Sequence, residues 1–96
     1  MENRFKNDPE FNRLLQGFIL GLTKRVDAIG HAAKKQEWDK LSLLAHRLKG
    51  AASSYGLPNV SECAGELEIL ALKKISDPKT FSLIEDLSKI VKTLTQ

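Results

Sequence analysis

The spacing of the apolar residues constrains the fold of this chain more than any other feature of its sequence. From Phe11 onward, aliphatic and aromatic side chains recur at steps of three and four residues, which is the spacing of one face of an α-helix. No segment alternates apolar and polar residues as a half-buried strand does. The pattern therefore predicts an all-α protein without a sheet.

Turn signals divide this pattern into four helices. A capping aspartate followed by proline, which favours the start of a helix, occurs at residues 8–9 and again at residues 77–78. Gly56 followed by Pro58 ends a helix, because glycine suits the position after a helix and proline cannot continue it. We therefore expect four helices, over residues 9–35, from 37 or 38 to 55, from about 60 onward and from 78 onward.

Each predicted helix carries an apolar stripe, and four such helices with short connections predict an antiparallel up-down-up-down four-helix bundle. The long first helix leaves room for a break or for a short extra N-terminal helix. Gly17, Gly21 and Gly30 lower its helix propensity, and we expect the close approach of a neighbouring helix to explain them. The residues expected in the core are Phe11, Leu15, Phe18, Ile19, Leu22, Val26, Ile29, Ala33, Leu41, Leu44, Ala45, Leu48, Ala52, Tyr55, Val60, Cys63, Ala64, Leu67, Leu70, Ala71, Phe81, Ile84, Leu87, Val91 and Leu94.

Length, cysteine content and charge limit the classes of function. A chain of 96 residues suits a single domain over residues 1–96 and is too short for a large cofactor-binding α/β enzyme. Its one cysteine, Cys63, cannot form an internal disulfide, which fits a reducing compartment. No apolar run reaches the ~20 residues that span a bilayer, and the N-terminus lacks the apolar stretch of a secretory signal. We therefore expect a cytoplasmic protein without a membrane segment, whose net charge of +3 suits an acidic partner surface.

The second predicted helix carries a histidine on its solvent side. At about 100° per residue, His46 lies away from the apolar stripe of its helix, and Gly50 lies on the same exposed face one turn later. Glycine there costs ~1 kcal/mol of helix stability relative to alanine, and no turn requires it. Its lack of a side chain would let a partner approach the imidazole closely. Leu43 adds an apolar contact and Lys49 a cation beside the ring.

An exposed histidine with this access and a nearby cation suits phosphoryl chemistry. Neutral imidazole is nucleophilic near neutral pH, and its attack on phosphorus gives a phosphoramidate that remains a good phosphoryl donor to a carboxylate. Lys49 would offset part of the phosphoryl charge. The sequence contains neither a P-loop nor a G-x-G-x-x-G turn, so we expect no kinase site of its own.

The segment around this histidine resembles the signature of the histidine-containing phosphotransfer (HPt) domain family. The matching residues are His46-Arg47-Leu48-Lys49-Gly50 with the following 51–56, the preceding Leu44-Ala45, and Cys63 with Leu67-Glu68 in the next helix. Chain length and helix order also agree with that family. The resemblance therefore spans the whole chain.

This resemblance implies a phosphorelay intermediate. His46 would accept a phosphoryl group from an aspartyl phosphate on a receiver domain and pass it to the aspartate of another response-regulator receiver. The implied partners are such receivers and an upstream hybrid sensor kinase. Because the receiver would supply Mg²⁺, we expect no cofactor or metal of the chain's own. Lys49 would assist the phosphoryl group, Gly50 would leave room, and Ser53 would orient it. The residues expected to contact the partner are Leu43, Arg47 and Ser54.

Other residues attract simpler interpretations. His31 lies among alanines and lysines without a glycine-bearing face, so we do not expect it to be reactive. Cys63 falls on an apolar stripe and is expected to be a buried packing residue. Glu66 and Glu68 are expected to be charged side chains in contact with solvent. No cluster has metal-ligand spacing.

Two rival functions remain at the level of sequence, a structural helical adaptor and a weak nucleic-acid-binding module. The basic pairs that would support the second are spread over separate helix ends, without a helix-turn-helix or RNA-binding motif, so we expect no nucleic-acid partner. The apolar stripes of the four predicted helices can all be buried against one another. We therefore also expect a monomer.

Overall fold

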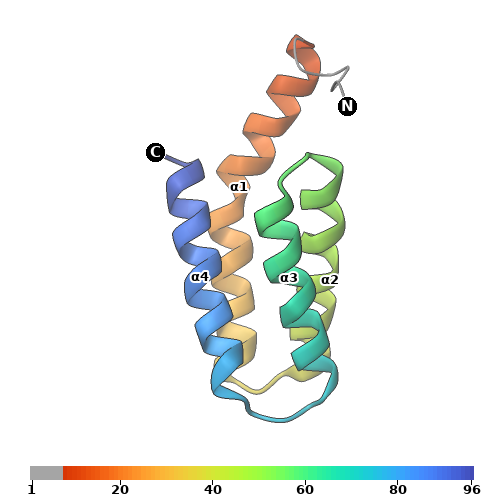
Figure 1. Cartoon of the computed structure of the whole chain (residues 1–96), viewed down its shortest axis with the longest axis vertical. Coiled ribbons are helices and arrows are strands. Elements are labelled where there is room, and N and C mark those ends of the chain that lie inside the picture. The colour runs from red at the N-terminus through yellow and green to blue at the C-terminus, as the bar shows by residue number, and fades with distance from the viewer. Residues whose placement is uncertain (1–7) are drawn as a thin grey trace.

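The chain folds into four α-helices joined by short turns. A computed structural model describes residues 8–96 and contains α1 (Pro9–Lys34), α2 (Trp38–Ser54), α3 (Pro58–Leu72) and α4 (Pro78–Leu94). The helices alternate in direction, as Figure 1 shows, and no strand occurs within the described part of the chain. The predicted all-α, up-down-up-down bundle is confirmed.

The helices occupy the corners of a square. α1 packs beside α2 and α4, and α3 packs beside α2 and α4, whereas the backbones of the diagonal pairs α1–α3 and α2–α4 do not come close. The most extensive contact joins α2 to α3. The seam between α2 and α3 therefore lies on the opposite side of the bundle from the seam between α1 and α4.

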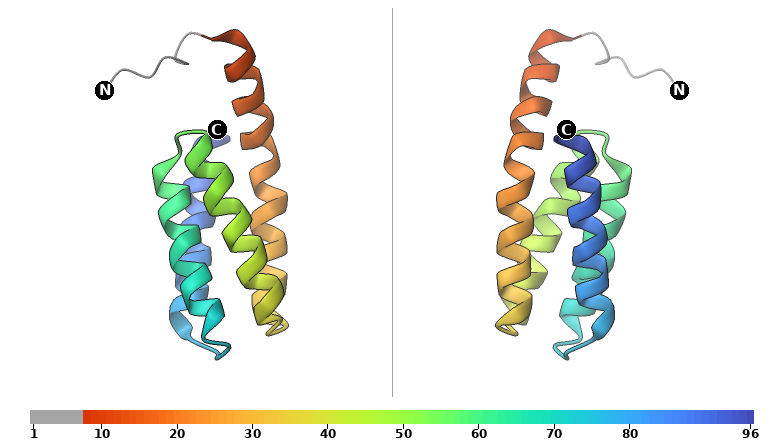
Figure 2. Two further views of the ribbon diagram at one scale, coloured as in Figure 1. Left: turned by 90° about the vertical axis from the view of Figure 1, so that its right-hand side faces the viewer. Right: turned by 90° about the vertical axis from the view of Figure 1, so that its left-hand side faces the viewer.

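The first helix is longer than the other three and is continuous. Its N-terminal turns project beyond the end of the bundle formed by the other helices (Figures 1 and 2). Residues 8–96 contain no break in α1 and no separate helix before it; a helix before residue 8 would lie outside the described residues. The ring of Phe18 stacks on Tyr55 at 4.7 Å between centroids, which ties α1 to the end of α2.

Both predicted helix starts have the expected caps. The Asp8 carboxylate accepts hydrogen bonds from the backbone N–H groups of Glu10 (2.9 Å) and Phe11 (3.3 Å). Asp77 accepts one from the N–H of Lys79 at 2.9 Å. These bonds satisfy donors that the first turn of a helix leaves without a partner, and proline follows each cap.

The core agrees with the predicted stripes in α1, α2 and α3 but not at the start of α4. Phe81 was expected inside and is 40% exposed, while Thr80 and Leu83 are buried instead. Steps of three and four fit a stripe that begins at either residue 80 or residue 81. The face that α4 turns toward α1 and α3 passes through Thr80, so the tertiary contact decides between them.

Cys63 is a packing residue. Its side chain is buried, and its S–H donates to the backbone carbonyl of Leu83 at 3.1 Å. Burial, together with the negative charges of Asp86 and Glu66, raises the pKa of the thiol to about 11. The thiol therefore stays protonated at neutral pH, as a structural cysteine should.

The expectation for the three glycines of α1 is wrong. A Cβ atom placed on Gly17, Gly21 or Gly30 would meet no atom within 4 Å apart from its own neighbours in the helix. No helix of the bundle approaches these positions closely. Their presence in a long helix is not explained by packing within the described chain.

α1 and α2 are each followed by a residue in the left-handed conformation, after which an N–H bonds back to a carbonyl of the helix. That residue is glycine after α2 and glutamine after α1. After α2, Gly56 has a φ of 72°, and the next N–H returns to the carbonyl of Ala52 at 2.9 Å. After α1, Gln36 has a φ of 57°, and the N–H of Glu37 returns to the carbonyl of Ala32, also at 2.9 Å. A left-handed conformation suits glycine and is unfavourable for glutamine.

We expect Gln36→Gly to stabilise the protein by about 0.5–1 kcal/mol, because it removes the left-handed strain of a residue with a Cβ. The free energy of unfolding, measured by urea denaturation, tests this. The control is Gly56→Ala, which places a Cβ at the other left-handed position and should destabilise by about 1 kcal/mol. An unchanged or lower stability in Gln36→Gly would contradict the expectation.

Candidate functional site

His46 lies in the middle of α2 and points into solvent. Its side chain is 68% exposed, while residues on the opposite face of the helix are fully buried against the other helices. The buried residues that fix the rotation of α2 are Leu41, Ala45, Leu48 and Ala52. The imidazole is thus held outward by the packing of its own helix, as the sequence predicts.

A carboxylate on the neighbouring helix orients the imidazole. The Nδ1 atom of His46 lies 2.8 Å from Oε2 of Glu68 on α3, and the Glu68 side chain is only 20% exposed. An ionised carboxylate only accepts hydrogen bonds, so beside ionised Glu68 the Nδ1 atom keeps its proton and its N–H donates the hydrogen bond to Oε2. The Nε2 lone pair then stays free for chemistry on the exposed side of the ring.

Glu68 is the functional residue that the sequence interpretation missed. We expected Glu66 and Glu68 to be solvated alike, and only Glu66 is. The two helices are antiparallel, and their register brings residue 68 level with residue 46. The occurrence of Glu68 among the residues that resemble the HPt signature was the only signal for it in the sequence.

Lys49 lies one turn after His46, at the same seam. Its aliphatic stem crosses Gly65 of α3: a Cβ atom on this glycine would stand 3.5 Å from Cδ and 3.6 Å from Cε of the lysine. The hydroxyl of Ser61 donates to the backbone carbonyl of Lys49 at 3.1 Å, which links the two helices. The side chain is exposed and makes no ion pair with any described residue, so its charge is available at the surface.

The exposed face beyond His46 is open. A Cβ atom on Gly50 would meet nothing within 4 Å, as expected for a residue that keeps an approach clear. Ser53 is exposed, and Ser54 donates its hydroxyl to the carbonyl of Gly50 at 3.1 Å, within its own helix. Lys49 and Gly50 thus follow His46 within about one helical turn, and neither serine forms a described hydrogen bond to the imidazole.

An apolar rim borders the imidazole on two helices. Leu43 is 47% exposed one turn before His46. On α3, the exposed Ile69 and Leu72 follow Glu68, and the antiparallel register puts Leu72 level with the turn that carries Leu43. Arg47 is exposed beside the histidine and has no ion-pair partner among residues 8–96. The sequence predicted Leu43 and Arg47 as contact residues but not the two residues on α3.

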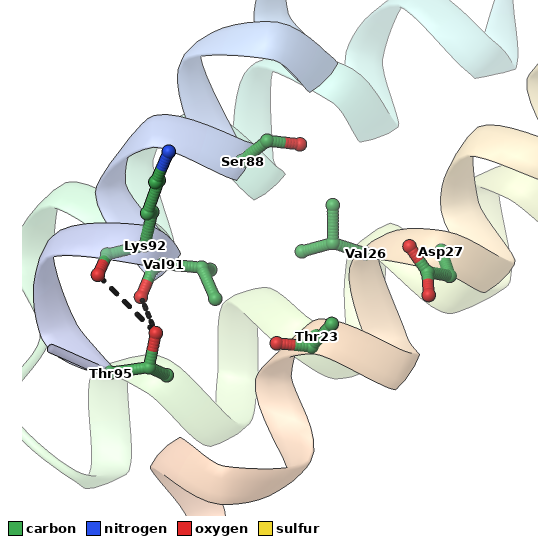
Figure 3. A pocket seen from close by; sticks show the side chains of 7 residues that line it. All are labelled: Thr23, Val26, Asp27, Ser88, Val91, Lys92 and Thr95. Carbon is green, nitrogen blue, oxygen red and sulfur yellow. Dashed lines mark hydrogen bonds between the residues drawn. The ribbon is translucent and has the colours of Figure 1, made fainter.

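None of the grooves described on residues 8–96 is lined by His46, Lys49 or Gly50, and one groove at the turn between α2 and α3 includes Ser53. A groove of about 290 Å³ lies on the opposite side of the bundle, between α1 and α4 (Figure 3). It is lined by Thr23, Val26, Asp27, Ser88, Val91, Lys92 and Thr95. None of the predicted site residues contributes to it.

Residues 8–96 contain no group of three or more His, Cys, Asp or Glu side chains placed to hold a metal ion. Among their helices, none combines the length and apolar character that crossing a membrane requires.

Fold and site together define a class of protein. The described residues form a four-helix bundle that presents an exposed histidine, His46, oriented by a carboxylate of the neighbouring helix. A sequence model of the Hpt domain family matches residues 13–96, which include all but the first turn of the bundle. The chain therefore belongs to the Hpt domain family, whose members are histidine phosphotransfer modules of two-component signalling rather than kinases. No curated protein and no solved structure matched the sequence.

Proposed function

We propose that this chain is a phosphorelay intermediate that takes a phosphoryl group from the aspartyl phosphate of one receiver domain and passes it to the aspartate of another. The observation that carries this proposal is the bond from His46 Nδ1 to Glu68, which leaves Nε2 as the free nucleophile on an open surface. An upstream hybrid sensor kinase would supply the first phosphoryl group. Its need for ATP makes the cytoplasm the proposed location.

The bonds formed and broken in the transfer step account for all atoms and charges without any cofactor of this chain. The Nε2 lone pair forms a bond to phosphorus, and the bond from phosphorus to the aspartate oxygen breaks, so that the receiver recovers its carboxylate. The proton stays on Nδ1, and the phosphorylated ring carries a positive charge next to Glu68. That charge makes the ring a good leaving group in the second transfer. The receiver would contribute the Mg²⁺ that both steps use.

The neighbouring residues have separate roles in this proposal. Lys49 would stabilise the charge of the transferring phosphoryl group, and its stem is supported by Gly65. Ser53 would orient the group once a receiver is bound. The contact surface would comprise Leu43, Arg47 and Ser54 of α2 with Ile69 and Leu72 of α3. Desolvation of the three aliphatic side chains would favour docking.

We expect Gly50→Gln to slow transfer about tenfold or more, because the new side chain stands where the receiver must approach Nε2. The rate should be measured as a function of receiver concentration, since the loss should appear in the apparent affinity. Gly30→Gln is the matched control: Gly30 is also a helical glycine with open space around it, but it lies on α1 away from His46. Equal rates for Gly50→Gln and the wild type would contradict the close-approach argument.

The proposed function is tested by incubating the protein with a panel of phosphorylated receiver domains. Label should reach the chain, be lost in acid and survive alkali, as a phosphoramidate does. Phosphorus NMR of the labelled protein should place the group on Nε2 of His46. Failure of every receiver to label the chain would refute the proposal, as would label that survives acid. A salt-dependent shift with DNA in place of labelling would favour the nucleic-acid alternative.

A further inference from the structure

The outer face of α1 carries two large apolar side chains that no part of the described bundle covers. Leu14 is 55% exposed and Leu20 is 75% exposed. On the helix they flank Gly17, each about 60° from its direction. Gly17 and Gly21 leave open space between and beside them. Two exposed aliphatic side chains therefore stand on either side of a glycine on this face.

One acidic and one basic residue on the same face lie symmetrically about Gly17, whereas the exposed Arg13, about 40° from the direction of Gly17, has no acidic counterpart. Glu10 lies seven residues before it and Lys24 seven residues after it, both within about 20° of its direction. Neither side chain forms an ion pair within residues 8–96. Leu14 and Leu20 share this symmetry, at three residues on either side. Two independent pairs, one apolar and one charged, thus have the same centre.

We propose that this face binds a second copy of the chain, with the two α1 helices antiparallel and a two-fold axis near Gly17. In that register Glu10 of one copy meets Lys24 of the other, twice in the dimer. Leu14 of one copy fills the space over Gly21 of the other copy. Leu20 of that other copy lies beside this Leu14. The complementarity of charge selects the antiparallel arrangement, since a parallel one would place Glu10 beside Glu10 and Lys24 beside Lys24.

The position of the face allows this association. It lies on the side of α1 away from the buried residues of that helix. The N-terminal turns of α1 also project beyond the other helices (Figure 2). α1 is diagonal to α3, and their backbones do not come close, so the α2–α3 seam with His46 stays free in a dimer. One helix pair buries less than the standard interface of about 1,600 Å², so the dimer is weak. This inference replaces the monomer expected from the sequence, and it does not depend on the proposed function.

Analytical ultracentrifugation of the full chain up to about 1 mM tests this association, a range suited to a weak interface. Wild type should show concentration-dependent dimerisation that salt weakens. Glu10→Lys and Lys24→Glu should each raise the dissociation constant about tenfold, because two symmetric pairs become repulsive. The double variant should restore association. Lys89→Glu, an exposed reversal on α4, is the matched control and should leave it unchanged.

A crosslink tests the position of the axis. Gly17→Cys should form a disulfide-linked dimer under mild oxidation, because the two cysteines face each other across the axis; the buried Cys63 does not compete. Lys89→Cys should crosslink far more slowly. A wild type that stays monomeric at the highest concentration would overturn the proposal, and so would a double variant that associates no better than the single ones. His46 labelling in all these variants separates this result from the phosphotransfer test.

Discussion

We expect His46→Gln to lose all phosphoryl acceptance from a phosphorylated receiver, while His31→Gln keeps it. Glutamine is similar in polarity to histidine but has no nucleophilic nitrogen, so no phosphoramidate can form. His46 is largely exposed, and the one side-chain contact described for it is Glu68, so its replacement should change the free energy of unfolding by less than about 1 kcal/mol. Loss of label would then report chemistry and not folding.

The His31 variant is the matched control because His31 is the other histidine of the chain, is exposed, and lies near the end of α1. Labelling should be followed by phosphate transfer over time, with circular dichroism of each variant as the check of the fold. If His46→Gln still took up acid-labile phosphate, His46 would not be the acceptor. Loss of label in both variants would point to a general effect on folding or docking.

We expect Glu68→Ala to slow phosphoryl uptake about tenfold or more, with Glu68→Gln less affected. Alanine removes the acceptor at 2.8 Å from Nδ1, so the proton can move to Nε2 and block the nucleophile. Glutamine can still accept from Nδ1 through its amide oxygen, which keeps the tautomer, but it cannot offset the charge of the phosphorylated ring. The difference between the variants separates orientation from charge.

Nitrogen NMR of the imidazole distinguishes this positioning role from a purely structural one. The wild type and Glu68→Gln should show the proton on Nδ1, whereas Glu68→Ala should show a mixture of tautomers. The control is Glu66→Ala on the same helix, since Glu66 is solvent-exposed, and it should change neither the tautomer nor the rate. A wild-type ring with its proton mainly on Nε2 would contradict the assignment of the nucleophile.

Local signals explain why the fold was predictable. Asp8 and Asp77 cap the helices that they were expected to start, because capping is a contact between a side chain and the backbone two or three residues away. The apolar stripes identified most of the core for the same reason, as helical periodicity depends only on the sequence of one element. The left-handed Gln36 was not foreseen, since the neighbouring elements fix that turn.

The chain's sequence by itself determined the four helices, the outward direction of His46 and the place of Gly50 on the same exposed face. These follow from a rotation of about 100° per residue and from the identity of residues within one helix. Only the tertiary structure decided that Glu68, and not Glu66, forms the hydrogen bond with the imidazole. It likewise decided that the aliphatic part of Lys49 packs over Gly65, and that Thr80 is buried in the core in place of Phe81. Each depends on the register and rotation of two helices far apart in sequence, which side-chain packing sets between elements and no single helix encodes.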